Sequence, residues 1–214
     1  MRAALVGLAL LACNKTPPEE PAPPTRPPTT SPGDPDVGAI DPGLPLDAPF
    51  QYRGWPGEGV PVITATRATS LPLLDRPAGT RVASCDLASG GELSYTASLV
   101  RSDRPAPVRL AAPMQLPQGS VSYGPVDVLD PATAHSTPAA GRTLGPDDQI
   151  AHLQFRAEGV CHYRVDNADV VETPCFHDAS SSAVTSWWVQ TSCAGRNGWV
   201  RVDDASDLDV ARRF

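Results

Sequence analysis

The chain has 214 residues and a formal net charge of −7, from 24 acidic and 17 basic side chains. No cluster of basic residues stands out from this acidic background, so we expect no nucleic-acid partner. The length is sufficient for one ordinary domain or two small ones.

The first thirteen residues, MRAALVGLALLAC, have the pattern of a secretory signal. The apolar run from Ala3 to Ala12 is shorter than the roughly 20 residues that span a bilayer. The ending LLAC resembles the lipobox, the cleavage signal of bacterial lipoproteins. This resemblance implies removal of residues 1–12 and attachment of lipid to Cys13, and Asn14 is similar to the outer-membrane sorting pattern. A cysteine placed by chance at the end of an ordinary signal peptide is the alternative.

We therefore expect an outer-membrane lipoprotein that is held to the membrane through Cys13 and faces either the periplasm or the cell surface. The segment that follows, residues 13–49, has no aromatic side chain and is rich in proline, as in TPPEEPAPPTRPPTTSPGDPD. Such a composition cannot bury enough apolar surface to offset the entropy lost on ordering. We expect a disordered, partly extended tether, although a proline-rich ligand for SH3 or WW domains is the alternative.

The region from Phe50 onward has the pattern of an all-β protein. Short segments rich in Val, Thr, Leu and Tyr alternate with clusters of Gly, Pro, Asp and Asn. Examples are RVASCDL at 81–87, VCHYRV at 160–165 and SWWVQTSC at 186–193. No stretch has a sustained helical period, so we predict strands throughout.

A weak internal repeat indicates two modules in this region. LASGGELSYTASLVR, which begins at Leu87, is similar to LGPDDQIAHLQFRAEG, which begins at Leu144. The offset between the two copies is about the size of one small barrel. We therefore predict a first β module at residues 50–118 and a second at residues 119–214.

Beyond the signal, four cysteines remain: Cys85, Cys161, Cys175 and Cys193. An even number in an exported protein indicates two disulfides, although four cysteines allow three pairings. Cys161 and Cys175 lie seven residues either side of Ala168, around the turn-like sequence DNAD, so a symmetric hairpin would place them opposite each other. We favour Cys161–Cys175 with Cys85–Cys193, the second bond joining the two halves of the folded region.

The stretch SWWVQTSCAGRNGWVRVDD contains three of the four tryptophans of the chain. A strand with tryptophan, a turn with glycine and a Gly-Trp-Val strand resemble the end of a bacterial SH3-like domain. The resemblance covers Val121 to Asp209 best and extends weakly to Val60–Ala112. It implies small β-barrels with a binding or scaffolding role, and peptidoglycan or a short peptide as the ligand.

Strand alternation divides the side chains of this stretch between two faces. Trp187 and Val189 are expected in the core, whereas Trp188, Trp199 and Arg201 are expected together on the opposite, exposed face. Burial of these tryptophans in the core or at a seam between the modules is the interpretation that we favour. Exposed aromatic side chains are typical of an interaction surface, however, so Trp188, Trp199 and Arg201 are the residues that we expect to bind a ligand.

The sequence contains no nucleophile elbow, no His-Glu-x-x-His pair and no glycine-rich phosphate loop, so we expect no enzyme activity. Cys161 and His162 are adjacent, and neighbours on a strand point to opposite faces, which argues against a catalytic pair. Zinc is able to use soft ligands from CH at 161–162 and CFH at 175–177. However, an oxidising envelope favours disulfides, so we expect neither a metal nor a cofactor.

Two alternatives to a peptidoglycan-binding or peptide-binding module remain open at this point. One is a docking component of an envelope protein assembly, in which the aromatic face contacts another protein. The other is a small secreted enzyme or metal-binding protein that uses the Cys/His cluster.

Overall fold

The structure is a computed structural model, and it describes residues 45–57, 59–166, 169–177 and 182–213. The regular secondary structure within these ranges consists of β-strands alone, which confirms the all-β fold class. The predicted signal peptide, Cys13 and the tether as far as residue 44 lie outside the described residues. Across the described ranges, no helix has the length and apolar character needed to cross a membrane.

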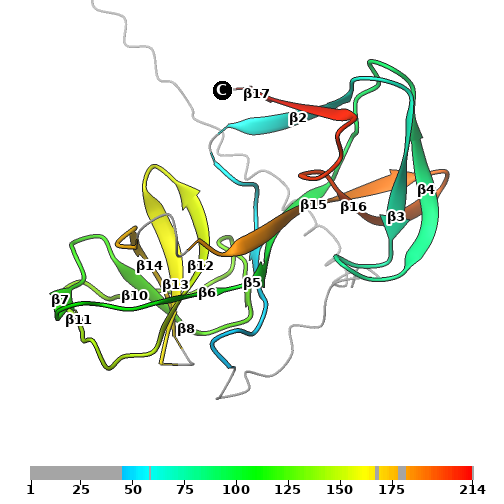
Figure 1. The fold of residues 1–214 in the computed structure, drawn as a ribbon. Coiled ribbons are helices and arrows are strands. Elements are labelled where there is room, and N and C mark those ends of the chain that lie inside the picture. The colour runs from blue at the N-terminus through cyan, green and yellow to red at the C-terminus, as the bar shows by residue number, and fades with distance from the viewer. Residues whose placement is uncertain (1–44, 58, 167–168, 178–181, 214) are drawn as a thin grey trace, which may run out of the picture. The chain divides into compact units, whose positions relative to one another are not determined.

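The larger sheet has seven strands in the order β4-β3-β16-β15-β5-β1-β9. Figure 1 labels β4, β3, β16, β15 and β5 of this sheet. Their bounds are Phe50–Arg53 (β1), Thr69–Leu74 (β3), Arg81–Leu87 (β4), Ala97–Arg104 (β5), Val128–Leu129 (β9), Val184–Cys193 (β15) and Arg196–Arg201 (β16). The β15–β16 hairpin occupies the middle of the sheet, because β15 pairs with β5 and β16 pairs with β3. This sheet therefore combines early strands with strands from near the C-terminus.

The second sheet has six strands in the order β10-β8-β14-β13-β12-β6. Their bounds are Ala106–Val108 (β6), Val121–Pro125 (β8), Thr137–Pro138 (β10), Ile150–Ala157 (β12), Val160–Val165 (β13) and Asp169–Pro174 (β14). Two smaller pairs complete the fold: Met114–Gln115 (β7) with Thr143–Leu144 (β11), and Val60–Ala65 (β2) with Leu208–Arg213 (β17). The six-stranded sheet thus comes from one continuous part of the chain.

The strand pairing differs from the predicted division at residue 118. β15, β16 and β17, which the prediction placed in the second module, pair with β5, β3 and β2 of the first. All described residues belong to one compact unit. The physical reason is burial: Trp187 and Val200 of the late hairpin pack against Leu73 and Val100 in the largest apolar cluster. No sheet in the described ranges closes into the barrel that the SH3-like resemblance implies.

Two disulfides join the same cysteines as the pairing favoured from the sequence. Cys85 of β4 bonds to Cys193 of β15 across a sequence separation of 108 residues. Cys161 of β13 bonds to Cys175, 14 residues later. The hairpin register differs from the symmetric one, because Cys161 lies opposite Thr173 and Cys175 follows the end of β14. The Cys161–Cys175 disulfide therefore joins diagonal rather than directly opposed positions of the hairpin.

A small apolar cluster connects the two large sheets. Phe50 and Tyr52 come from β1 of the seven-stranded sheet, and they pack with Leu153 and Val170 of the six-stranded sheet. All four side chains are buried. Contacts of this kind make the two sheets parts of one folded body.

Arg164 of β13 fixes the first described residues to the six-stranded sheet. Its side chain is fully buried. Its Nη1 donates hydrogen bonds to the carbonyl oxygens of Pro45 at 3.1 Å and Ala48 at 2.8 Å. The predicted tether extended to residue 49, but its last residues are held in this contact. The folded region therefore begins a few residues earlier than the composition suggested.

Candidate functional site

The three residues predicted to bind ligand do share one face of the β15–β16 hairpin. Trp188 lies directly opposite Arg201, and Gln190 lies directly opposite Trp199, which places all four side chains on the same side of the sheet. Trp187 and Val189 lie on the other face, in the main core. The assignment of faces made from alternation therefore agrees with the structure.

The two tryptophans are buried, however, and do not form an exposed aromatic surface. Trp188 is 4% exposed and Trp199 is 6% exposed. Leu99 of β5 lies opposite Trp188, and Leu74 of β3 lies opposite Trp199, and these four side chains form one cluster. Alternation identifies a face but does not show what packs against it. Here the flanking strands of the larger sheet bury the tryptophan rings.

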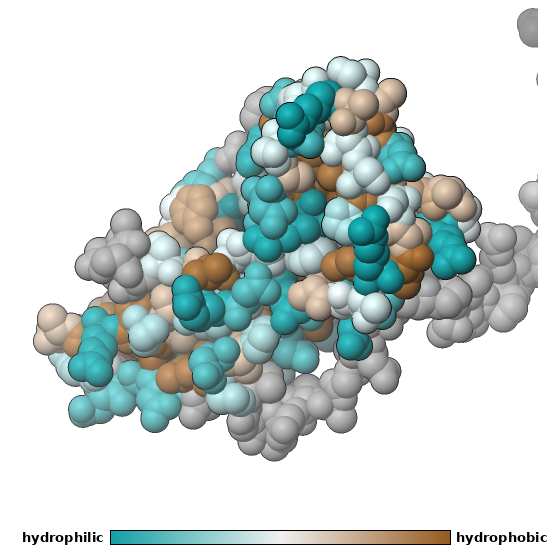
Figure 2. All heavy atoms as spheres, turned by 45° about the vertical axis from the view of Figure 1, so that its right-hand side comes forward, coloured by the Kyte–Doolittle hydropathy of each residue, from teal (hydrophilic) through white to brown (hydrophobic). Residues whose placement is uncertain are grey.

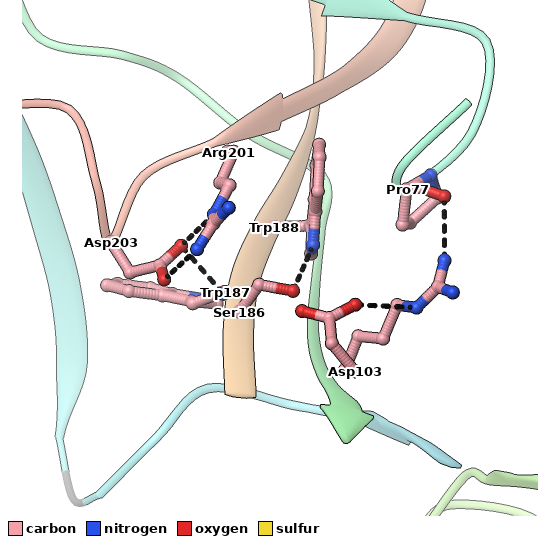
Figure 3. Close-up of polar contacts among 8 residues, drawn as sticks. Pro77, Asp103, Ser186, Trp187, Trp188, Arg201 and Asp203 are labelled. Carbon is pink, nitrogen blue, oxygen red and sulfur yellow. Dashed lines mark hydrogen bonds and ion pairs between the residues drawn. The ribbon is translucent and has the colours of Figure 1, made fainter. Parts of the chain in front are cut away.

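Hydrogen bonds fix both tryptophans of β15 in place. The Trp188 indole Nε1 donates to the Ser186 hydroxyl at 2.9 Å, and the Trp187 indole Nε1 donates to the Ser98 hydroxyl at 2.6 Å. Figure 3 shows the Asp203 carboxylate close to the Trp187 backbone, whose N–H donates to it at 2.9 Å. Because each buried indole N–H has an acceptor, the aromatic residues form a rigid support.

Arg201 is held in place by two carboxylates. Its Nε and Nη2 donate to the two carboxylate oxygens of Asp203 at 2.9 and 3.0 Å (Figure 3). Its Nη1 lies 3.1 Å from a carboxylate oxygen of Asp204. The hydrogen bond to Asp203 and the nearby acidic charges raise the pKa of the Arg201 guanidinium, despite partial burial. A bidentate pair of this kind fixes the plane of the guanidinium as well as its position.

Trp188 and Arg201 line a surface pocket of about 340 Å³. The pocket has an apolar part and a polar, charged part. Its lining consists of Leu71, Pro72, Leu74, Trp188, Arg201, Asp204, Ala205, Ser206 and Asp207. Trp199 is not among these residues and instead packs behind Trp188. The structure thus brings two of the three predicted ligand-binding residues to one pocket and makes the third a support.

The charges around this pocket are predominantly negative. Asp207 is paired with Arg67 at 2.6 Å, and this hydrogen bond lowers the pKa of the Asp207 carboxyl. Arg201 is paired with Asp203 and Asp204. Three aspartates are thus balanced by only two arginines, Arg67 and Arg201, which leaves a net negative charge at neutral pH. The pocket therefore favours a ligand that combines an apolar group with a positive charge.

The described lining of the pocket has little catalytic chemistry. Ser206 supplies its one hydroxyl, which donates to Asp207 at 3.2 Å, and neither histidine nor cysteine is present in that lining. A nucleophilic serine needs an adjacent general base such as histidine. The described lining therefore does not contain the serine–histidine pair of an acyl-transfer site.

Few large apolar side chains are exposed on the described surface. These are Val60, Val82, Phe155 and Val184, and each comes from a different strand. On the face drawn in Figure 2, hydrophobic residues alternate with hydrophilic ones rather than forming one continuous patch. That face therefore resembles an ordinary solvent-exposed surface more than a large docking interface.

Sequence reasoning missed a row of buried polar residues across three strands of the smaller sheet. Gln154 of β12 lies opposite His162 of β13, which in turn lies opposite Glu172 of β14. The fully buried His162 is 3.0 Å from Gln154 through Nδ1 and 2.8 Å from Glu172 through Nε2. Arg156 donates to the same Glu172 oxygen at 2.7 Å, and its guanidinium lies 5.5 Å from the centre of the Tyr52 ring.

The protonation of this row follows from burial. Burial lowers the pKa of His162, although Glu172 opposes the shift, so the imidazole is neutral at pH 7. Burial acts to raise the pKa of Glu172, but His162 and Arg156 outweigh it and leave this pKa lowered. His162 therefore carries its proton on Nε2 and donates it to the Glu172 carboxylate, while Nδ1 accepts from the Gln154 amide.

The row has a structural role in the architecture. Phe50 and Tyr52 of the larger sheet pack against the His162 ring, with ring centres 5.8 and 5.2 Å away. Neither a serine nor a cysteine contacts His162 among the interactions of the described residues. Cys161 lies on the opposite face of β13, as alternation predicted. The only sequence signal for this row is a polar residue between two core positions, and its partners depend on the register of the two neighbouring strands.

Comparison with known proteins does not assign the chain to a family. No family model, no curated protein and no solved structure matches it.

Proposed function

We propose that this protein is a lipid-anchored protein of the bacterial envelope whose folded region binds a ligand without catalysis. The anchor is Cys13, and the proline-rich segment carries the folded region away from the membrane surface. The binding site is the pocket of Trp188 and Arg201. The observation that supports this proposal most directly is that a buried, hydrogen-bonded tryptophan and a fixed arginine line one surface pocket.

The ligand is a short peptide with an apolar group and a positive charge, such as the peptide part of peptidoglycan. The apolar group contacts Leu71, Leu74 and Trp188. The positive charge of the ligand lies near Asp204 and Asp207. These residues, with Arg201, form the charged rim of the pocket, which has a net negative charge. Both walls are fixed before the ligand arrives, which reduces the entropy lost on binding.

Charge reversal at the rim tests this proposal. The full chain with Cys13→Ser, which removes the lipid-bearing thiol, is mixed with purified cell-wall sacculi and sedimented. We expect the protein to co-sediment, and Asp204→Lys to weaken the binding, because a positive rim repels a cationic ligand. Asp147→Lys is the matched control, since Asp147 is exposed and lies outside the pocket.

The result that rejects the peptidoglycan ligand is an unmodified protein that remains in solution. Equal loss of binding in Asp204→Lys and Asp147→Lys would instead indicate an effect of total charge rather than of the pocket. Binding that depends on salt supports the electrostatic part of the proposal, because screening weakens attraction between exposed charges.

A further inference from the structure

A second cluster of chemically active side chains lies in the smaller sheet, away from the tryptophan pocket. His152, Cys161 and His177 each offer a ligand atom, and these atoms all lie within 4.8 Å of one another. Cys161 is bonded to Cys175. We propose that reduction of the Cys161–Cys175 disulfide converts this cluster into a Zn²⁺ site with two thiolate and two imidazole ligands.

The strand register brings these residues to one face of the sheet. His152 of β12 lies opposite Tyr163 of β13, and Cys161 lies two residues before Tyr163 on the same face. His177 follows β14 and packs against His152, with ring centres 3.9 Å apart. Cysteine and histidine from three neighbouring strand regions therefore converge, which is the donor set that zinc prefers.

Tyr163 positions His177 for this role. Its hydroxyl oxygen accepts a hydrogen bond from the Phe176 N–H at 3.0 Å and lies 2.6 Å from Nδ1 of His177. The Tyr163 ring also stacks on Phe176, with centres 4.0 Å apart. Since Nδ1 is held by tyrosine, Nε2 is the ligand atom of His177. A hydrogen bond to the second ring nitrogen is the usual support of a metal-bound histidine.

Binding at His152 affects a hydrogen bond to the backbone. Its Nδ1 accepts a hydrogen bond from the Ala183 N–H at 3.1 Å. Zinc at Nδ1 would replace this hydrogen bond, and zinc at Nε2 would place a proton on Nδ1, opposite the same N–H. In either case the Ala183 N–H loses its acceptor, so metal binding is coupled to a movement at the start of β15.

Reduction is necessary because a thiolate, and not a disulfide sulfur, is the zinc ligand. Cys161 is fully buried, whereas Cys175 is partly exposed, so a dithiol reductant meets the sulfur of Cys175 first. A thiolate of the reductant forms a disulfide with the Cys175 sulfur, and the Cys161 sulfur leaves as a thiolate. The second thiol of the reductant then closes a cyclic disulfide and releases the Cys175 thiolate. The reductant thus transfers two electrons to the protein. The two cysteine thiolates then bind Zn²⁺ instead of the two protons that they would carry as thiols.

The test is titration with Co²⁺, a spectroscopic substitute for Zn²⁺, of the full chain carrying Cys13→Ser. One sample is oxidised, and the other is reduced with a dithiol that is then removed without air. We expect the reduced protein to bind one Co²⁺ with the strong visible absorption of a tetrahedral site and a thiolate-to-cobalt band, and Zn²⁺ to displace it. The oxidised protein is expected to show neither band.

Variants locate the site. His152→Ala and His177→Ala keep the disulfide, and each is expected to weaken Co²⁺ binding by at least about 10- to 100-fold. His135→Ala is the matched control, because His135 is exposed in a loop, and it is expected to bind as the unmodified protein does. Circular dichroism of each variant checks that the fold is retained.

Three outcomes would overturn the proposal. The first is reduced protein that does not bind Co²⁺ with these bands, and the second is oxidised protein that binds it equally well. The third is a folded His152→Ala, His177→Ala double variant that binds with unchanged affinity, which would place the metal on Cys85 and Cys193 or elsewhere.

Discussion

Trp188 and Arg201 lie directly opposite each other on the β15–β16 hairpin, and both line the same surface pocket. The tryptophan is buried and donates to Ser186, whereas the arginine is half-exposed and held by Asp203 and Asp204. A single cross-strand pair thus supplies both an apolar wall and a charged rim. This pair lies in the middle of the seven-stranded sheet, whereas residues 204–207 of the pocket lie in the loop between β16 and β17.

The first prediction concerns the stability that the Trp188 side chain provides. Trp188→Ala removes a buried aromatic ring from the cluster with Leu99 and Trp199, so we expect the free energy of unfolding to fall by about 3–5 kcal/mol. Urea unfolding followed by circular dichroism measures this loss. Phe155→Ala is the control, because Phe155 is 57% exposed, and its effect is expected within about 0.5 kcal/mol. Equal effects of the two substitutions would show that the tryptophan cluster is not part of the core.

The second prediction compares the two disulfides. In the chain-entropy account, a longer closed loop restricts the unfolded chain more strongly. Removing Cys85–Cys193, which closes 108 residues, is expected to cost about 4.7 kcal/mol, and removing Cys161–Cys175, which closes 14 residues, about 3 kcal/mol. Paired Cys→Ser variants, unfolded in urea, test this order. A larger loss from the shorter loop would mean that native-state contacts, rather than loop closure, determine the effect.

The third prediction is a pH dependence that arises from His162. Burial lowers the pKa of this histidine in the folded protein below its ordinary value of 6.5. Below that pH the unfolded chain binds more protons than the folded protein does, so the free energy of unfolding decreases as the pH falls. One such group contributes a slope of at most about 1.4 kcal/mol per pH unit. Urea unfolding between pH 7.5 and 5.5 measures it.

His162→Gln tests the origin of this slope. Glutamine can still donate to Glu172 but does not titrate, so the variant is expected to lose this part of the pH dependence. His135→Gln, at an exposed position, is expected to keep it. The account fails if His162→Gln and the unmodified protein have the same slope. Glu172, whose pKa is also lowered, contributes only at lower pH, near and below its ordinary value of 4.5.

Local features of the fold could be predicted from the sequence. Alternation and composition placed strands at 81–87 and 160–165, where β4 and β13 lie with the same bounds. These features depend on short-range patterns, namely a period of two residues and turn-forming clusters between segments. The weak repeat does not mark equivalent strands, because β5 begins ten residues after Leu87 and β12 six residues after Leu144.

The arrangement of the strands could not be predicted in the same way. That β15 pairs with β5 depends on which apolar faces bury each other across about 90 residues, and alternation contains no information on partners. For the same reason, alternation left open whether Trp188 is exposed, because Leu99 and Leu74 come from strands distant in sequence. His162 differs, because its partners Gln154 and Glu172 are close in sequence, and there it is the exact register of the two hairpins that the pattern does not give.

The most direct test of the central claim fills the pocket without changing its charge. Ser206 is exposed and lines the pocket, so Ser206→Trp places a large ring where the ligand is expected to bind. Ser136→Trp is the matched control in an exposed loop. In sedimentation with sacculi, the account predicts that the unmodified protein and Ser136→Trp are pulled down and that folded Ser206→Trp is not. Equal binding by Ser206→Trp would contradict the pocket as the binding site.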